Sequence, residues 1–346
     1  MKFERAVCIG RFQPLHLGQL AVIRRALEIA PLAVVVIGSA HQARTPRNPL
    51  TWEERAEMIR LALPEADRER VRFAPVRDCY DTVCWVQAVR TAVGASGAVH
   101  GARVALVGHR KDATTEYLDH FPGWKVVDIG RQGELHAKAL RAALFAGSDA
   151  EAALAAIAAQ VPASTTAFLR AWVQLPFFAH LRSEWQELDA EHAKWQGSPY
   201  PPVFVTVDAL VQMAGHVLLI RRGRAPGRGL LALPGGFVEQ RETLFQSAVR
   251  ELQEETGFAL LPASMQVALK AVRVFDHPDR SQRGRVITHV HHFVLGASPL
   301  PEVRGGDDAT DARWVPIRGL PALEAQFHDD HFHILESFLG AEMSGG

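Results

Sequence analysis

The chain has 346 residues, enough for two domains that each bury a core of their own. Lys plus Arg and Asp plus Glu both number 38, so no overall basic field exists to gather nucleic acid or an anionic membrane surface, and any phosphate binding must be local. Three cysteines do not indicate a disulfide framework, and no run of about 18 apolar residues could span a bilayer. We therefore expect a cytoplasmic protein without nucleic-acid or membrane partners.

Short apolar runs alternate with amphipathic stretches over residues 6–128. The runs AVCIG, LAVVVIG, VRFAPV and RVALVG have the composition of buried strands, and helical patterns lie near residues 17–29, 52–63 and 82–92. Strands separated by helices of this length imply parallel βαβ units with right-handed crossovers. The first half of the chain is therefore predicted to be a Rossmann-like α/β domain.

The pattern becomes helical up to about residue 194, and the segment QGSPYPP then interrupts it with Gly and three prolines. Beyond this break, VFVTVDALV, HVLLIRR and VITHVHHFVL read as strands around one long helix, which indicates an α+β domain. We expect a first domain over residues 1–195, a linker over residues 196–202, and a second domain over residues 203–346.

The loop after the first strand reads GRFQPLHLGQL, residues 10–20. A glycine at a strand end, a histidine and a following helix N-terminus place backbone N–H groups where phosphates could bind. The loop resembles the GRFxPxHxGH motif of the HxGH nucleotidyltransferases. This resemblance implies that His16 stabilises ATP phosphates during nucleotidyl transfer, and that Gly10, Arg11, Phe12 and Gln19 belong to the nucleotide site.

Three further segments, residues 37–59, 76–86 and 107–124, resemble archaeal-type nicotinamide mononucleotide (NMN) adenylyltransferases. The resemblance implies that Asn48, Arg55 and Trp85 lie near NMN, and that Gly108, Lys111 and Asp112 lie near ATP.

Two features depart from that pattern. Gln19 stands where the family has its second histidine, and a glutamine cannot become cationic. The late ISxTxxR phosphate-binding segment appears as LHAKALR, in which only Arg141 is retained, so His136 or Lys138 would have to supply the missing charge. These departures leave an alternative open, in which the first domain is a catalytically weak nucleotide-sensing or dimerising module beside an active hydrolase.

The long helix of the second domain carries three glutamates on one face. Residues i, i+3 and i+4 of a helix are neighbours, so Glu251, Glu254 and Glu255 converge, and their mutual repulsion favours Mg²⁺ or Mn²⁺ as the neutralising ligand. The surrounding residues, GGFVEQRETLFQSAVRELQEETGF, fill every specified position of the Nudix box. The second domain therefore resembles the Nudix hydrolases.

The Nudix resemblance implies metal-dependent cleavage of a nucleoside diphosphate. Glu254 and Glu255 would be metal ligands together with the Gly235 carbonyl, and Glu251 would be a further ligand or the base that activates water. Arg250 would orient the glutamates. The sequences LLALPGGFVE and DHPDRSQRGRVITHVHHF are similar to the ADP-ribose pyrophosphatase branch, in which Arg280, Arg283 and Arg285 could hold phosphates. A Nudix-type transcriptional regulator is the less favoured alternative, because that class tolerates a broken box.

The order of the two domains resembles the bifunctional NMN adenylyltransferase and ADP-ribose pyrophosphatase proteins. It implies that ATP and NMN give NAD and pyrophosphate at the first site, and that ADP-ribose gives AMP and ribose 5-phosphate at the second. Small-molecule nucleotides are then the expected partners, with a homo-oligomer possible. The histidines at positions 289, 291, 328, 331 and 333 are interpreted as packing residues, and Cys79 and Cys84 as core thiols.

Overall fold

Residues 3–95, 103–109, 118–130, 135–147, 149–296 and 299–344 are described by the structure, which is a computed structural model. The chain divides into two compact units, Met1–Ser183 and Glu184–Gly346. In the described part of the chain, no helix is long and apolar enough to cross a membrane.

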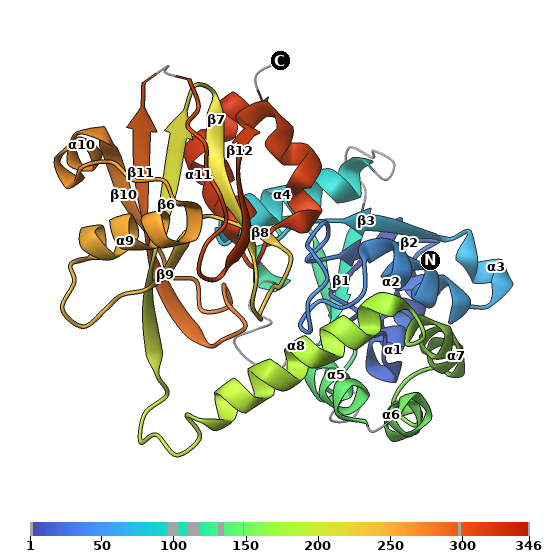
Figure 1. The fold of residues 1–346 in the computed structure, drawn as a ribbon. Coiled ribbons are helices and arrows are strands. Elements are labelled where there is room, and N and C mark those ends of the chain that lie inside the picture. The colour runs from blue at the N-terminus through green and yellow to red at the C-terminus, as the bar shows by residue number, and fades with distance from the viewer. Residues whose placement is uncertain are drawn as a thin grey trace. The chain divides into compact units, whose positions relative to one another are not determined.

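The first unit is built on a five-stranded sheet in the order β3-β2-β1-β4-β5, and every adjacent pair is parallel (Figure 1). Its strands are β1 (Arg5–Gly10), β2 (Leu32–Ile37), β3 (Val71–Pro75), β4 (Val104–Gly108) and β5 (Lys125–Asp128). The strand order reverses between β1 and β4, and ligands of such sheets bind beyond the carboxyl ends of the strands at this point. The predicted Rossmann-like sheet is confirmed.

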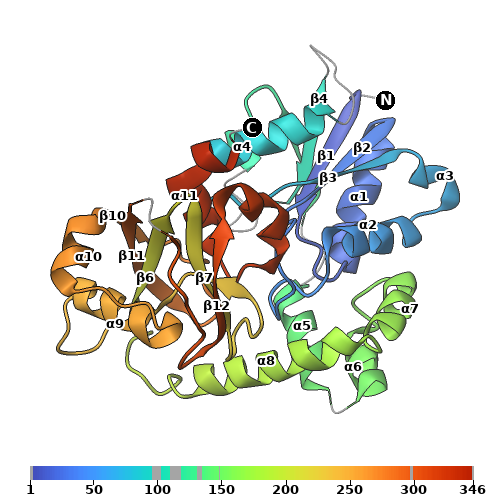
Figure 2. The same ribbon diagram turned by 45° about the horizontal axis from the view of Figure 1, so that its top comes forward.

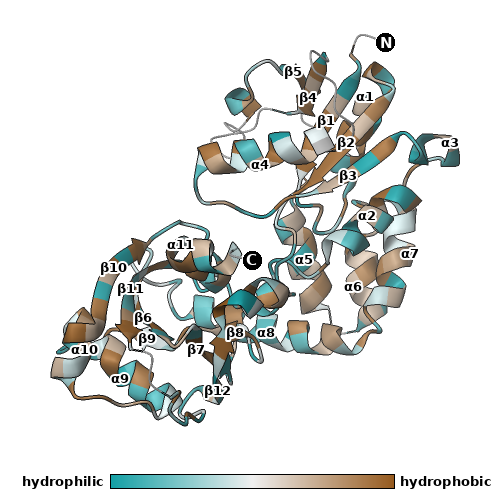
Figure 3. Cartoon of the chain, turned by 90° about the horizontal axis from the view of Figure 1, so that it is seen from above, coloured by the Kyte–Doolittle hydropathy of each residue, from teal (hydrophilic) through white to brown (hydrophobic). Residues whose placement is uncertain are grey.

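Helices enclose this sheet, as Figure 2 shows for α1 and α4. The helices of the βαβ region are α1 (Leu17–Ile29), α2 (Trp52–Leu61), α3 (Glu65–Arg68) and α4 (Thr82–Ala95). Buried strand residues such as Val7, Val34 and Leu106 pack with Val89 of α4 in one cluster. The apolar colour of the strands and the mixed colour of α4 in Figure 3 reflect this arrangement. The prediction that Cys79 and Cys84 are core thiols is wrong, because Cys79 is half-buried and Cys84 is exposed.

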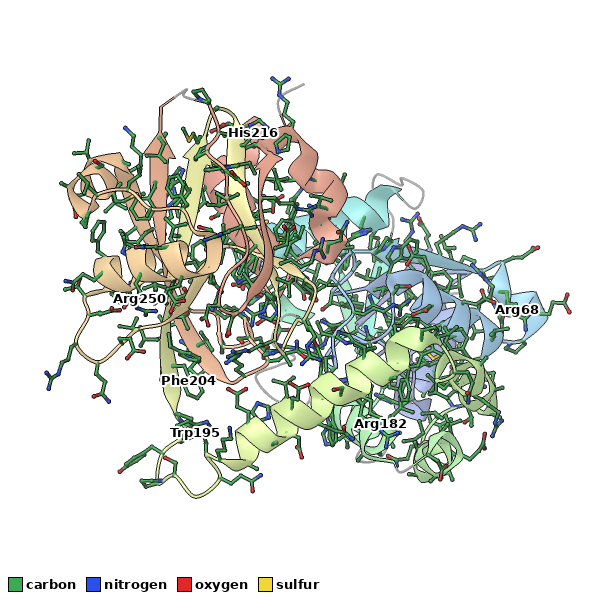
Figure 4. All side chains as sticks on the ribbon, viewed as in Figure 1. Arg68, Arg182, Trp195, Phe204, His216 and Arg250 are labelled. Atoms are coloured by element: carbon green, nitrogen blue, oxygen red, sulfur yellow. The ribbon has the colours of Figure 1, made fainter. Side chains whose placement is uncertain are left out.

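Four further helices follow the sheet: α5 (Ala137–Ala146), α6 (Ala150–Ile157), α7 (Ala163–Trp172) and α8 (Pro176–Ala193). The start of α8 is packed within the first unit, where the Phe178 ring stacks on Phe145 at 5.7 Å. Arg182, labelled in Figure 4, donates a hydrogen bond to the Gly147 carbonyl oxygen. The division between the units falls within α8, after Ser183.

The second unit contains a mixed sheet with the order β10-β11-β6-β7-β12, to which β8 and β9 are added beside β7 and β6. Its strands are β6 (Val203–Met213), β7 (His216–Arg222), β8 (Leu231–Ala232), β9 (Gly235–Phe237), β10 (Leu269–Phe275), β11 (Arg285–Leu295) and β12 (Ala309–Pro316). Its helices are α9 (Leu244–Thr256), α10 (Pro262–Ala268), a 3₁₀ segment (Ile317–Gln326) and α11 (His331–Ser344). The predicted α+β architecture is confirmed.

Helices cover both faces of this sheet (Figure 1). On one face, Leu252 of α9 and Met265 of α10 pack with Ala209 and Val211 of β6. On the other face, Leu335 of α11 packs with buried residues of β6 and β7. Because α9 lies against β6 and β9, its glutamates face the end of the sheet where the Gly235–Gly236 pair runs.

Candidate active sites

The loop after β1 adopts a conformation that favours glycine at its start. A Cβ atom on Gly10 would lie 3.0 Å from the Phe12 ring, so the small residue lets this ring fold back onto the strand end. Phe12 has a φ of 52°, and Ser39 and His41, beyond the end of β2, have φ values of 49° and 63°. Non-glycine residues rarely adopt this region, and such strain clusters at functional sites.

His16 begins α1 and forms a reciprocal cap with Gln19. The His16 Nδ1 atom accepts from the Gln19 N–H at 3.3 Å, and the Gln19 Oε1 atom accepts from the His16 N–H at 3.4 Å. Since Nδ1 is an acceptor, a neutral His16 carries its proton on Nε2. The residue that replaces the second histidine therefore fixes the first one at the helix N-terminus.

Arg55 lies beneath the loops of this site. Its side chain is 1% exposed and donates to the carbonyl oxygens of Arg11 at 2.8 Å, Gly38 at 2.7 Å and Ser39 at 3.1 Å. Burial lowers the pKa of Arg55 to about 10, which leaves it cationic at neutral pH. The structure therefore places Arg55 as a support that ties the ends of β1 and β2 together.

Asn48 belongs to a polar chain that ends at Asp78. The Asn48 amide donates to Gln42 at 2.7 Å, the Gln42 amide donates to Asp78 at 3.1 Å, and Asp78 also accepts from the Ser39 hydroxyl at 2.6 Å. The Asn48 Oδ1 atom is buried, with no hydrogen-bond partner among the described residues. Asp78 was not predicted as a site residue, because a single carboxylate in a loop is not part of a recognisable sequence motif. Trp85 packs edge-on against the Phe121 ring at 5.9 Å.

Arg141 of α5 reaches back to the loop after β1, where it donates to the Gln13 carbonyl oxygen at 2.8 Å. Burial, together with the nearby charges of Arg11 and Arg47, lowers the pKa of Arg141 to about 10. The guanidinium groups of Arg11, Arg47 and Arg141 therefore lie close enough for their charges to repel one another. Arg47 was not singled out in the sequence.

The other residues predicted for the first site lie at the end of β4, at the start of α5, or outside the described residues. Gly108 ends β4, and the Leu118 side chain would lie 3.3 Å from a Cβ atom at this position. His136 and Lys138 lie at the start of α5 and are exposed. Lys111 and Asp112 lie outside the residues that the structure describes.

In the second unit, the cap residues of α9 fix where its glutamates point. Thr243 accepts from the Gln246 N–H, and the Gln246 side chain accepts from the Thr243 N–H in return. The helix ends at Gly257, which has a φ of 66° and so terminates the helix in the left-handed conformation. The predicted long helix is confirmed.

Arg250 holds several carboxylates at the exposed side of α9 (Figure 4). Its Nε atom donates to Glu242 at 3.0 Å, and its Nη1 atom donates to Glu251 at 2.8 Å and to Glu254 at 2.9 Å. A further bond joins its Nη2 atom to the Phe237 carbonyl oxygen. These contacts are those expected of a residue that orients the glutamates.

Glu255 differs from the other two glutamates because it is buried. It is 3% exposed and accepts from the Gly235 N–H at 2.8 Å. Burial raises the pKa of Glu255 to about 8, and burial also raises the pKa values of Glu251 and Asp208. Asp208 on β6 accepts from the Thr288 hydroxyl and lies beside Gly235.

All three glutamates line a cavity of about 620 Å³ within the second unit. Six further lining residues are charged or polar and come from segments far from α9 in the sequence: Arg222, Arg280, Arg283, His328, Asp329 and His331. Arg280 and Arg283, two of the three arginines predicted to bind phosphate, therefore line the same cavity as the glutamates. Arg285 is not among the lining residues and donates instead to the Asp276 carbonyl oxygen. The interpretation of His328 and His331 as simple packing residues is incomplete, since both face this cavity.

The cavity wall opposite α9 is held by buried polar contacts. Arg280 forms a two-bond pair with Asp330, at 2.9 and 2.7 Å, and the His331 Nδ1 atom accepts from the Leu233 N–H at 3.0 Å. Burial lowers the pKa of His331 to about 3, so the ring is neutral. Gly227 has a φ of 79°, and a Cβ atom there would lie 2.2 Å from the His328 ring.

The donor set around α9 fits a hard divalent cation. The candidate ligands are all oxygens, and desolvated carboxylates with raised pKa values become easier to ionise when a cation is bound. In the described ranges, no three acidic, histidine or cysteine side chains are already gathered around one point, and Arg250 bridges Glu251 and Glu254. Arg250 therefore already neutralises part of the negative charge of Glu251 and Glu254, which a bound cation would neutralise as well.

Comparisons with known proteins divide the chain in the same way. A family model for the NUDIX domain matches residues 202–338, and one described as cytidylyltransferase-like matches residues 7–121. A nicotinamide/nicotinic acid mononucleotide adenylyltransferase of Acinetobacter baylyi is 31% identical over 192 residues, which cover 55% of this chain and 98% of that protein. An ADP-ribose pyrophosphatase of Methanocaldococcus jannaschii is 38% identical over 136 residues, 39% of this chain and 72% of that protein.

Solved structures extend the likeness over both units. The crystal structure of a bifunctional NMN adenylyltransferase/ADP-ribose pyrophosphatase from Francisella tularensis matches with a TM-score of 0.90 and 32% identity, covering 99% of this chain and all of that one. A second such structure, complexed with AMP and a manganese ion, matches with a TM-score of 0.89 and 31% identity, at 99% and 100% coverage. The chain therefore belongs to the family of bifunctional NMN adenylyltransferase/ADP-ribose pyrophosphatase proteins.

Proposed function

We propose that this protein has two activities in NAD metabolism. The first unit transfers the adenylyl group of ATP to NMN, giving NAD and pyrophosphate. The second unit hydrolyses ADP-ribose to AMP and ribose 5-phosphate. Membership of the bifunctional family supports both reactions, because the two bifunctional crystal structures align over 99% of this chain and so over both units.

One observation supports the hydrolase most directly. A single cavity carries carboxylates of α9 on one wall and the guanidinium groups of Arg222, Arg280 and Arg283 on others. A nucleoside diphosphate matches this arrangement, because arginines bind its phosphate oxygens while the carboxylates hold cations that neutralise the remaining charge.

In the second unit, one set of residues is proposed to bind the cation, and a second set orients these ligands. Nudix hydrolases use divalent metals, and we assign Glu251, Glu254, Glu255 and the Gly235 carbonyl as the residues that would hold Mg²⁺ or Mn²⁺ here. When bound, such a cation offsets phosphate charge and makes water a better nucleophile. Arg250 fixes Glu251 and Glu254, while the Gly235 N–H fixes Glu255, so the ligands are held by contacts of their own.

In the first unit, catalysis is positioning and charge stabilisation. The oxygen of the NMN phosphate attacks the α-phosphorus of ATP, and pyrophosphate leaves, so no group of the protein becomes covalently bound. His16 Nε2–H, the α1 N-terminus and the cluster of Arg11, Arg47 and Arg141 are the donors proposed for the triphosphate. Asn48, whose Oδ1 is buried without a partner in the described residues, is proposed to bind NMN.

The full chain and two single-site variants test this proposal. We expect the wild-type protein to form NAD from ATP and NMN and to release AMP from ADP-ribose. His16→Ala should remove NAD formation only, and Glu255→Gln should remove most ADP-ribose hydrolysis only, with both variants folded.

Two results would contradict the assignments. Wild-type hydrolysis by Glu255→Gln would refute its role at the metal. No NAD formation by the wild-type protein would favour the alternative, in which the first unit senses nucleotides and Gln19 marks the loss of catalysis.

A further inference from the structure

The second half of α8 belongs to the second unit, although it precedes the stretch that matches the NUDIX model at residues 202–338. Glu184, Leu188, Glu191 and Trp195 are spaced by four, three and four residues, so they lie on one side of the helix and its continuation. Glu184 is 1% exposed and Leu188 is 6% exposed, which shows that this side is covered. The chain ahead of the matched domain is therefore packed onto it.

One contact of this helix fixes the loop between β7 and β8, residues 223–230. Glu184 accepts from the backbone N–H of Arg228 at 2.7 Å. The neighbouring residue, Gly227, is the one that approaches the ring of His328 on the cavity wall. Glu184 thus holds a loop whose backbone packs against a residue of the hydrolase cavity.

A second group of contacts fixes the loop between β10 and β11, residues 276–284. Glu191 accepts from Arg283 Nη1 at 3.4 Å, and His192 Nε2 lies 3.0 Å from the Gln282 carbonyl oxygen. Arg283 lines the cavity, and its guanidinium carbon lies 5.6 Å from the centre of the Phe237 ring. Its Nη2 atom also donates to the Ala225 carbonyl oxygen at 3.3 Å. Arg283 is therefore held on three sides, one of which is α8.

The aromatic contacts beyond the helix end reinforce this arrangement. The rings of Trp195 and Phe204 meet edge to face at 5.6 Å, and those of Phe204 and Phe237 do so at 5.8 Å. Figure 4 shows Trp195 and Phe204 near each other. The series runs from the end of α8 to the ring beneath Arg283, so the helix supports that side chain both through charge and through packing.

We propose that the side of α8 and its continuation that carries Glu184, Glu191 and Trp195 supports the hydrolase site. On this side, Glu191 is a positioning residue for Arg283, which binds a phosphate of the nucleoside diphosphate. This inference rests on the proposed hydrolase function. It predicts that removing the Glu191 charge weakens substrate binding through Arg283, without disturbing the carboxylates of α9.

The test is a kinetic comparison of full-length Glu191→Gln, Arg283→Gln and the double variant, with ADP-ribose as substrate. Glu191 and Arg283 are partly exposed, with side-chain exposures of 28% and 23%, and such pairs contribute modestly, so we expect KM to rise about two- to fivefold in Glu191→Gln with kcat little changed. In the double variant KM should be no higher than in Arg283→Gln alone, because the two residues act through one contact. Glu191→Asp should restore part of the loss.

Asp189→Asn is the matched control, since it removes one negative charge from an exposed position of the same helix. It should leave KM unchanged, and NAD formation should be unchanged in every variant. A wild-type KM in Glu191→Gln, or KM effects that multiply in the double variant, would overturn the positioning role. No ADP-ribose hydrolysis by the wild-type protein would instead overturn the proposed function, and this inference with it.

Discussion

Two adjacent glycines in β9 have different neighbours, so alanine should affect different properties at each. Gly236→Ala should lower hydrolase activity, and Gly235→Ala should lower the stability of the second unit. A Cβ atom on Gly236 would lie 2.5 Å from Glu251 Oε1, whereas real Cβ contacts essentially never fall below 3.0 Å. The Glu251 carboxylate must therefore retreat by at least about half an ångström, which disturbs its 2.8 Å bond to Arg250. Since a misplacement of about 1 Å can cost about 100-fold in rate, we expect Gly236→Ala to lower the hydrolase kcat by roughly 10- to 100-fold.

At Gly235 the nearest neighbour is a backbone atom, and the Asp208 carboxylate comes next. A Cβ atom there would lie 2.2 Å from the Val207 carbonyl oxygen, so β6 and β9 would have to separate. Overpacking of this kind costs about 1–3 kcal/mol. For a domain of this size that corresponds to a fall in the Tm of the second unit of about 2–12 °C. Gly236→Ala should show little change in Tm, because the end of a glutamate side chain can move.

The assay follows ADP-ribose hydrolysis and thermal unfolding for both variants, with NAD formation as the internal control for the first unit. Neither glycine has a positive φ, so backbone strain does not contribute to the comparison. Wild-type turnover in Gly236→Ala would refute the claim that Glu251 must sit where the structure places it. An equal loss of Tm in both variants would refute the distinction between backbone and side-chain neighbours.

Three other substitutions test the supports of the two sites. Arg55→Met should lower the free energy of unfolding of the first unit by about 3 kcal/mol or more, since several buried carbonyl groups lose their donor; denaturant unfolding and NAD formation report it. Arg141→Gln should raise KM for ATP about tenfold while leaving ADP-ribose hydrolysis intact, because it removes a charge-assisted phosphate contact. Gly227→Ala should destabilise the second unit by about 1–3 kcal/mol and reduce hydrolysis, because its Cβ would meet His328 in a strained backbone; thermal unfolding of the full chain measures this.

The sequence predicted the features that depend on local periodicity. The helix at residues 17–29 and the strand ends at Gly10 and Gly108 appear as expected, because apolar spacing and glycines at strand ends are local signals. The α9 glutamates are also local, since their spacing alone places them on one face. The edge strands β5 and β10 were not singled out, because an edge strand that is partly exposed has a weaker apolar pattern.

Residues joined by the tertiary fold could not be found in the same way. Asp208, Arg222 and His328 meet in one cavity although they lie on β6, on β7 and beyond the 3₁₀ segment. Nothing in the sequence links them, since the link is the sheet order β6-β7 and the return of the chain after β12. The contribution of α8 to the second unit could not be predicted from the sequence either. The prolines within residues 199–202 favour a domain boundary after the helix, whereas the units divide after Ser183.

Substitutions of the buried pair Arg280 and Asp330 can distinguish two roles of Arg280, support of the fold and binding of the substrate. Their side chains are 5% and 1% exposed, so Asp330→Asn would leave a buried guanidinium without its counter-charge. Breaking one partner of such a pair costs about 3–5 kcal/mol, whereas replacing both by apolar residues is often neutral or stabilising. We therefore expect Asp330→Asn to lower the Tm of the second unit strongly, and Arg280→Met with Asp330→Leu to restore it.

Hydrolysis should not return with stability in that double variant. Arg280 lines the cavity beside Arg283, so its charge is part of the surface that faces the phosphates. The measurement is kcat/KM for ADP-ribose in the restored double variant, with NAD formation confirming that the first unit is intact. If kcat/KM recovers together with Tm, Arg280 acts only through the fold, and the phosphate contact must be assigned to Arg222 and Arg283 instead.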